Sequence, residues 1–217
     1  MNILSAVIAI VILIFSAILH EIAHGFVAER FGDPTARLAG RLTLDPRKHI
    51  DPVMSIFLPL LLILSGSPVV FGAAKPVPID PFNLKEGRKD IALVALAGPL
   101  TNILIAVLGS LLLKFISLPF IASLLPQVLL AVFGTLLFLI IQLNLLLAIF
   151  NLIPIPPLDG SKVFSLLLPE RESLVFLSFG SVGFFILFFL LLFPIGGFSL
   201  GQFVFNLLSF SEKLLGL

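Results

Sequence analysis

Long apolar stretches dominate the chain, and their lengths predict a protein built from membrane-spanning helices. A helix needs roughly 20 apolar residues to cross a bilayer. Four segments are long enough and apolar enough to do so: about 3–28, 90–114, 127–151 and 173–193. We therefore expect an all-α polytopic membrane protein in which residues 1–217 form a single domain.

Three further segments are harder to interpret. Residues 53–64 supply only about a dozen apolar positions, which favours a short re-entrant or interfacial segment over a crossing. The C-terminal segment 198–217 carries polar positions along its length, so a short helix or one lying at the membrane interface is expected there. Prolines and glycines around Val69 to Pro78 predict a small extended, β-like region associated with the membrane.

Composition supports a membrane protein and narrows its chemistry. Hydrophobic residues make up 59% of the chain and charged residues 12%, with a mean hydropathy of +1.22, far from ordinary soluble domains. The expected surroundings are therefore a lipid bilayer, and no nucleic-acid motif or strongly basic domain is present. Because the chain has no cysteine, His, Asp and Glu are the strong metal ligands that remain.

The positions of the cations predict the orientation of the chain. Eleven of the thirteen Lys and Arg residues lie between the first two spans or shortly after the third. Cations in short loops mark the cytoplasmic side. If residues 53–64 dip into the membrane and return, these cations share that side; if the segment crosses, they are divided between both sides. The dip is the favoured prediction.

The pentapeptide His20-Glu21-Ile22-Ala23-His24 lies near the end of the first predicted span. Residues four apart share one face of a helix, so the two imidazoles can bind one metal ion. Glu21 lies beside that face, where its carboxylate can act as a general base on water. An ionisable residue inside a span costs on the order of 2.5 to 3.5 kcal/mol, which favours a functional pocket over incidental polar positions.

A zinc site of this kind needs a third protein ligand, and Asp159 is the best candidate. It follows the third span in the proline-rich sequence Asn151-Leu-Ile-Pro-Ile-Pro-Pro-Leu-Asp159-Gly160, which cannot continue a regular helix. An even number of crossings between His24 and Asp159 would bring them to the same depth, which agrees with the dip at residues 53–64. The alternative for Asp159 is a helix cap or turn residue.

Polar residues in the middle spans have less certain roles. Asn102, after Gly98-Pro99, either forms a packing hydrogen bond between helices or positions substrate or an oxyanion. Asn144 and Asn151 lie on one face of the third span, where they would hold it against its neighbours. His49 has charged neighbours and is interpreted as a solvated loop residue outside the site.

Three motifs, in this order, resemble the site-2 protease family of M50-type intramembrane zinc metalloproteases. They are His20-Glu21-x-x-His24, Gly98-Pro99-x-x-Asn102 and Asn151-x-x-Pro154-x-Pro156-x-x-Asp159-Gly160. The sequences Lys48-His-Ile-Asp-Pro52 and Gly72-Ala-Ala-Lys-Pro-Val-Pro78 are similar to the short bacterial and archaeal branch, which lacks PDZ and CBS domains.

The resemblance implies one zinc ion per chain, bound by His20, His24 and Asp159, with Glu21 activating water. The expected substrates are transmembrane proteins or peptides, cut within or beside the bilayer. The expected location is the cell membrane, with several spans and the active site toward the cytoplasmic side. Val69 to Pro78 would offer a strand edge to an unwound substrate. The alternatives are a metal-ion transporter and a catalytically silent membrane scaffold.

Overall fold

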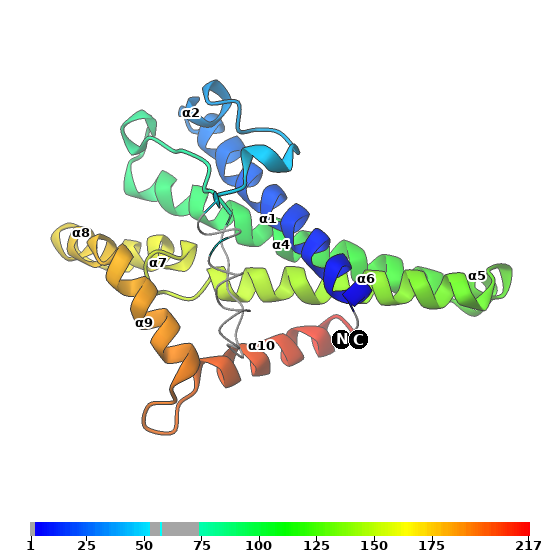
Figure 1. Cartoon of the computed structure of the whole chain (residues 1–217). Coiled ribbons are helices and arrows are strands. Elements are labelled where there is room, and N and C mark those ends of the chain that lie inside the picture. The colour runs from blue at the N-terminus through cyan, green and yellow to red at the C-terminus, as the bar shows by residue number, and fades with distance from the viewer. Residues whose placement is uncertain (1–2, 53–56, 58–73) are drawn as a thin grey trace.

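The computed structural model describes residues 3–52, 57 and 74–217, and the described chain is mainly helical (Figure 1). Its three longest helices are α1 (Ile3–Arg30), α4 (Arg88–Ile116) and α6 (Gln127–Asn151). By length and composition, these three are long and apolar enough to cross a membrane. They confirm three of the four predicted spans, with ends within two residues of those expected.

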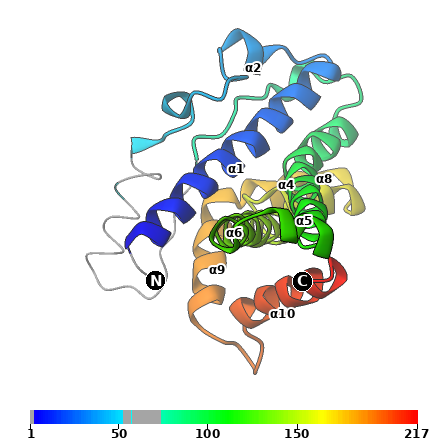
Figure 2. The same ribbon diagram turned by 90° about the vertical axis from the view of Figure 1, so that its right-hand side faces the viewer.

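Helix α4 lies at the centre and packs against both α1 and α6. Small residues allow the close approach: Ala106 is fully buried, and a Cβ atom on Gly109 would lie 3.0 Å from Ile141 of α6. Figure 2 views α6 along its axis, with α1 above it and α10 below it. The three spanning helices therefore form a layered unit with α4 and α6 as an antiparallel pair.

The predicted fourth span is divided into two helices, α8 (Glu170–Ser178) and α9 (Gly180–Leu192). The axes of Glu170–Ser178 and Val182–Leu192 differ by 68°, and the 13 residues of α9 alone are too few for a crossing. One continuous span over 173–193 is thus not confirmed. Gly183 lies so close to the carbonyl of Pro156 that a Cβ atom there would overlap it, so α9 is placed by contact with the proline-rich segment.

The C-terminal segment forms the 15-residue helix α10 (Leu200–Leu214). The hydroxyl of Ser199 caps its first turn by accepting a hydrogen bond from the amide of Gln202, at 3.3 Å. Leu208 packs against Ile141 and its neighbours, and Gln142 donates to Glu212 at 2.8 Å. The expectation of a short helix agrees with this element, which lies along α6.

Short elements connect these helices. They are α2 (Thr35–Leu38), η1 (Pro46–Lys48), η3 (Pro81–Asn83), α5 (Pro119–Leu124), α7 (Asp159–Phe164) and η4 (Ser165–Leu167). Residues 74–80 form neither helix nor strand, and among the described residues the only β pairing is a single bridge between Ile195 and Phe198. The expected β-like region is not confirmed, and residues 69–73 lie outside the described part. So does the predicted dip at 53–64, apart from Phe57.

Candidate metal centre

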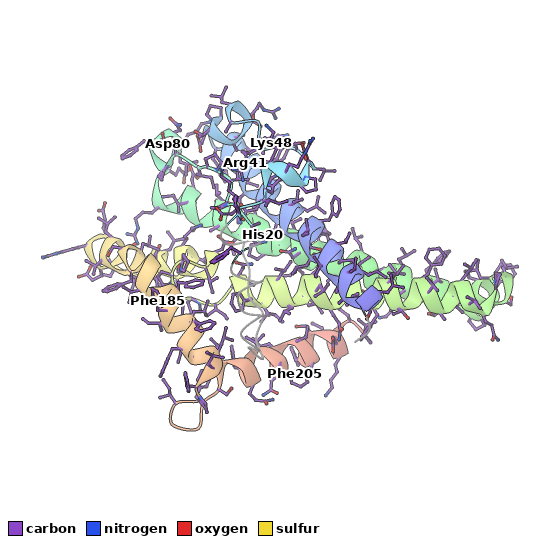
Figure 3. The ribbon with its side chains drawn as sticks, viewed as in Figure 1. His20, Arg41, Lys48, Asp80, Phe185 and Phe205 are labelled. Atoms are coloured by element: carbon purple, nitrogen blue, oxygen red, sulfur yellow. The ribbon has the colours of Figure 1, made fainter. Side chains whose placement is uncertain are left out.

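Helices α1 and α7 bring the three predicted metal ligands together. His20 and His24 are each 6% exposed on the face of α1 that packs against α4, and Asp159 is 7% exposed at the start of α7. Gly160 allows α7 to begin there, because a Cβ atom at that position would overlap the carbonyl of Leu152. Figure 3 places His20 beneath the loops that carry Arg41 and Asp80.

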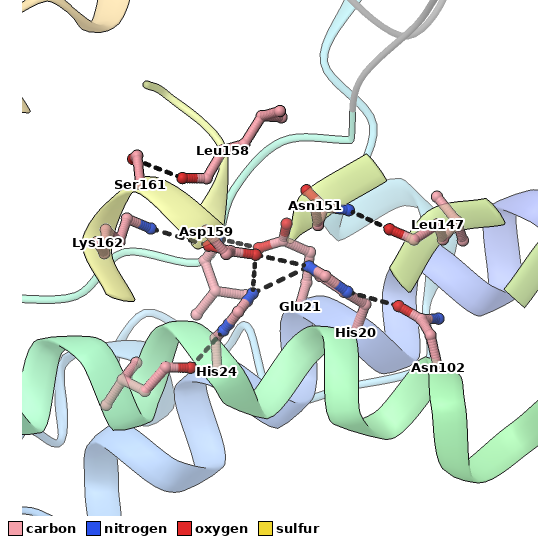
Figure 4. Close-up of polar contacts among 12 residues, drawn as sticks. His20, Glu21, His24, Asn102, Leu147, Asn151, Leu158, Asp159, Ser161 and Lys162 are labelled. Atoms are coloured by element: carbon pink, nitrogen blue, oxygen red, sulfur yellow. Dashed lines mark hydrogen bonds and ion pairs between the residues drawn. The ribbon is translucent and has the colours of Figure 1, made fainter. Parts of the chain in front are cut away.

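The three ligand atoms form a nearly equilateral triangle. His20 Nε2 and His24 Nε2 are 3.0 Å apart, and each lies 3.1 Å from Asp159 Oδ2 (Figure 4). In a tetrahedral zinc site with bonds of about 2.0 Å, two ligand atoms are about 3.3 Å apart. The triangle therefore fits a zinc ion that binds above its plane, with the fourth position left for water or substrate.

Each imidazole is held in the tautomer that metal binding requires. His20 donates from Nδ1 to Asn102 Oδ1 at 2.6 Å, and His24 donates from Nδ1 to the carbonyl of Val94 at 2.7 Å. With the proton on Nδ1, the lone pair of Nε2 faces the centre of the triangle. Helix α4 supplies both of these acceptors, so it orients both histidines of α1.

Gly98 of α4 forms one wall of the metal centre. A Cβ atom at this position would lie 2.5 Å from both Cε1 and Nε2 of His20, and 2.5 Å from Nε2 of His24. Only glycine therefore leaves space for the two imidazoles in this arrangement. In the sequence, Gly98 was noted only as part of the Gly98-Pro99-x-x-Asn102 motif, and its contact with the two histidines was not predicted.

The Asp159 carboxylate is held between the histidines and a lysine. Its Oδ1 accepts from Lys162 Nζ at 3.0 Å, while Oδ2 faces the two imidazoles. Burial alone would raise the pKa of Asp159, but its close contacts with His20 and His24 and the charge of Lys162 hold it well below its ordinary value. The carboxylate is thus ionised, which is the form that binds a cation.

The Glu21 carboxylate lies beside the ligand pair on α1. Its Oε2 accepts a hydrogen bond from the backbone amide of Val77 at 2.7 Å. Val77 belongs to the segment 74–80, which forms neither helix nor strand and lies far from α1 in sequence. This contact was not predicted, because no property of Val77 in the sequence indicates where its amide lies.

Three polar residues, Asn102, Asn144 and Ser16, form a series of hydrogen bonds between the three long helices. Asn102 and Asn144 are both fully buried; Asn102 Nδ2 donates to Asn144 Oδ1 at 2.9 Å, and Asn144 Nδ2 donates to Ser16 Oγ at 3.0 Å. Asn144 therefore connects α6 to its neighbours as expected. Asn151 instead donates to the carbonyl of Leu147 within its own helix, at 3.0 Å.

The interpretation of His49 as a solvated residue was wrong. The side chain is 2% exposed, and its Nε2 donates to the carbonyl of Thr43 at 2.8 Å. Its charged neighbours in the sequence suggested an exposed side chain. The burial of His49 instead depends on how the loop folds back on itself, which the sequence does not indicate.

A helical membrane protein with a buried His/His/Asp centre, and a glutamate next to the first histidine, has the features of a zinc metalloprotease. Comparison with known proteins agrees. The chain belongs to peptidase family M50, the site-2 type of metalloendopeptidase, whose family model matches residues 119–194, the part that contains Asp159.

Two relatives illustrate the similarity. YwhC of Bacillus subtilis is 38% identical over 191 residues, which cover 88% of this chain and 83% of YwhC. Rip2 of Mycobacterium tuberculosis is 37% identical over 145 residues, which cover 67% of this chain and 51% of Rip2. Both are provisionally named as zinc metalloproteases, and zinc is the metal of the family. No solved structure matches the chain.

Proposed function

We propose that this chain is an intramembrane zinc metalloprotease that hydrolyses peptide bonds of membrane-protein substrates within or beside the bilayer. Residues 1–217 act as a single domain, and His20, His24 and Asp159 hold one zinc ion per chain. The observation that carries the proposal is the triangle of ligand atoms, 3.0 to 3.1 Å on each side, with Nδ1 of each histidine already engaged.

Zinc supplies Lewis acidity, which polarises a carbonyl group and makes water easier to deprotonate. Glu21 takes the proton from the attacking water at Oε1, while its Oε2 is held by the Val77 amide. The oxygen of the water bonds to the scissile carbonyl carbon. Glu21 then returns the proton to the amide nitrogen as the carbon–nitrogen bond breaks, which leaves a carboxylic acid and an amine. The acid passes its remaining proton to the amine, so that the final products are a carboxylate and an ammonium group.

Asn102 acts as a positioning residue for His20. Its carboxamide oxygen accepts from the imidazole, and its nitrogen donates to Asn144, so both ends are engaged in a fully buried side chain. This supports the packing hydrogen bond between helices that the sequence suggested, together with the positioning of a metal ligand. It does not favour the other roles considered from sequence, in which Asn102 positions substrate or stabilises an oxyanion.

The active site faces the cytoplasmic side of a multi-pass protein in the cell membrane. Loops at the Arg30 end of α1 carry most of the cations, and Arg88 connects two of these loops by donating to the carbonyl of Leu168 at 2.8 Å. Lys114 is one of the two cations that lie elsewhere, and it is beside Gly216 at the other end of α4. Because most cations lie in the loops at the end of α1 nearer the site, and cations in short loops mark the cytoplasmic side, their distribution supports this orientation. His20 lies ten residues before Arg30, about 15 Å along the helix.

The test is cleavage of single-span peptides by detergent-purified protein, with wild type and Glu21→Gln compared and the zinc content of both measured. We expect about one zinc per chain in both proteins and cleavage by wild type alone. Cleavage by Glu21→Gln at the wild-type rate would remove Glu21 from the mechanism. Zinc uptake into proteoliposomes without peptide cleavage would favour the transporter, and binding of zinc with neither activity would favour the scaffold.

A further inference from the structure

The backbone amide that contacts Glu21 belongs to a segment held at both ends. Val77 lies between Pro76 and Pro78, and its side chain is 5% exposed. It packs so closely on α1 that a Cβ atom on Gly25 would lie 2.9 Å from its Cγ1. Because each proline fixes its own φ and restricts the preceding residue, the segment is stiff, and Val77 is its buried residue.

At its N-terminal end, the segment is held through Lys75. The amide of Lys75 donates to the carbonyl of His49 at 2.8 Å, and its carbonyl accepts from Arg41 Nη2 at 2.7 Å. Arg41 is 7% exposed, and the buried imidazole of His49 is itself bonded to Thr43. The loop that follows α2 therefore holds both backbone groups of Lys75, two residues before Val77.

At its C-terminal end, the segment is held by Asp33. The amide of Asp80 donates to Asp33 Oδ2 at 2.8 Å, and the side chain of Asn83 donates to Asp33 Oδ1 at 3.0 Å. Thr35 donates to the same carboxylate through its amide, at 3.1 Å, and through its hydroxyl. Asp33 is fully buried, three residues after the end of α1.

We propose that Arg41 and Asp33 are positioning residues that act on Glu21 through the segment Lys75–Asp80. They hold the Val77 amide where it fixes Oε2 of Glu21, so that the other carboxylate oxygen is oriented for proton transfer. A glutamate side chain has three rotatable bonds, and a displacement of about 1 Å at a reacting group can cost on the order of a hundredfold in rate. This inference rests on the proposed role of Glu21 as general base.

The first experiment removes the hydrogen bond between Val77 and Glu21. Val77→Pro deletes the amide proton in a segment that already contains two prolines, and it also changes the buried side chain. The control Val77→Ala likewise changes the buried side chain but keeps the amide. We expect kcat on a peptide that wild type cleaves to fall about tenfold or more in Val77→Pro relative to Val77→Ala, with KM and zinc content unchanged. Equal kcat values for the two variants would overturn the proposal.

The second experiment tests action through Glu21, and does not depend on how well Val77→Pro folds. Arg41→Gln removes the donor to Lys75, and Arg47→Gln is the control, since its side chain is 87% exposed and pairs with Asp45 in the same loop. Each is combined with Glu21→Asp, which is one methylene shorter and so withdraws the carboxylate from the Val77 amide.

We expect Arg41→Gln to lower kcat on the order of tenfold with Glu21 present and to have little further effect with Asp at position 21. Arg47→Gln should leave kcat unchanged in both backgrounds. The same tenfold loss from Arg41→Gln in both backgrounds would refute action through Glu21. If Glu21→Gln is inactive while Val77→Pro and Arg41→Gln cleave like wild type, the inference fails and the proposed function stands. Full cleavage by Glu21→Gln would remove the proposed function itself.

Discussion

Gly98→Ala gives the most direct test of the metal centre, because it adds one methyl group and removes nothing. The glycine lies in the middle of α4, where alanine favours the helix by about 1 kcal/mol. Helix propensity alone would therefore predict a more stable protein. The position of the histidines predicts the opposite effect on metal binding.

The size of the effect follows from the space available. The new methyl carbon would lie 2.5 Å from Nε2 of each histidine, whereas carbon and nitrogen atoms that are not bonded stay about 3.5 Å apart. Each ring must then move by about 1 Å. Such a shift either separates the ligand atoms or breaks the hydrogen bonds from His20 to Asn102 and from His24 to the carbonyl of Val94. Loss of such outer contacts alone lowers metal affinity about 10 to 100-fold.

The assay is a zinc competition titration with a chromogenic chelator on purified protein, together with thermal unfolding. We expect Gly98→Ala to bind zinc on the order of 100-fold more weakly than wild type and to lose cleavage while remaining helical. Gly134→Ala is the matched control, since its new methyl group would meet only Leu113, at an ordinary 3.9 Å. Wild-type zinc affinity in Gly98→Ala would refute the geometry described for the site.

Three further outcomes are expected. Asn102→Ala leaves Nδ1 of His20 without its acceptor and should weaken zinc binding about 10 to 100-fold in the same titration, while equal affinity would argue against a positioning role. Removal of zinc by a chelator should abolish cleavage, and adding zinc back should restore it. The circular dichroism spectrum should change little on chelation, because protein hydrogen bonds already hold the ligands; a loss of helix would contradict this expectation. Burial raises the pKa of Asp33, but hydrogen bonds from Thr35, Asn83 and Asp80 lower it overall, below its ordinary value of 3.8. A lowered pKa in the folded state stabilises the fold above the unfolded-state value and loses this effect as pH falls, so the melting temperature of Asp33→Asn should be lower than that of wild type at pH 7 and approach it below about pH 4. A constant difference across this range would show that ionisation of Asp33 does not contribute.

The three proposed ligands could be named from the sequence. The helical period places His20 and His24 on one face, and Asp159 follows the third predicted span in a proline-rich segment. The prediction that Asp159 lies at their depth used an even number of crossings and so depended on the dip at 53–64, which lies outside the described residues apart from Phe57. The partners of these ligands follow no such rule. The acceptor for His24 is the carbonyl of Val94, and every residue has a carbonyl, so only the packing of α1 against α4 identifies it.

The predicted fourth span shows where hydropathy is insufficient. The apolar run over 173–193 has the composition of a span, and Gly180 and Gly183 within it are common enough in membrane helices to be passed over. The structure divides the run between α8 and α9, and Gly183 of α9 contacts the carbonyl of Pro156. This contact joins positions 27 residues apart, and no periodicity within the run indicates it.

The polar residues inside the spans connect helix packing with metal binding. A polar side chain in an apolar helix is costly without a partner, and Ser16, Asn144 and Asn102 satisfy one another across α1, α6 and α4. Asn102 Oδ1, the acceptor at the end of this series of hydrogen bonds, is the atom that fixes the tautomer of His20. The hydrogen bonds that hold the three helices together therefore also orient a proposed metal ligand. It follows that correct association of the spans is a condition for a competent metal centre, and that a change at the Asn144 contact reaches His20 through Asn102.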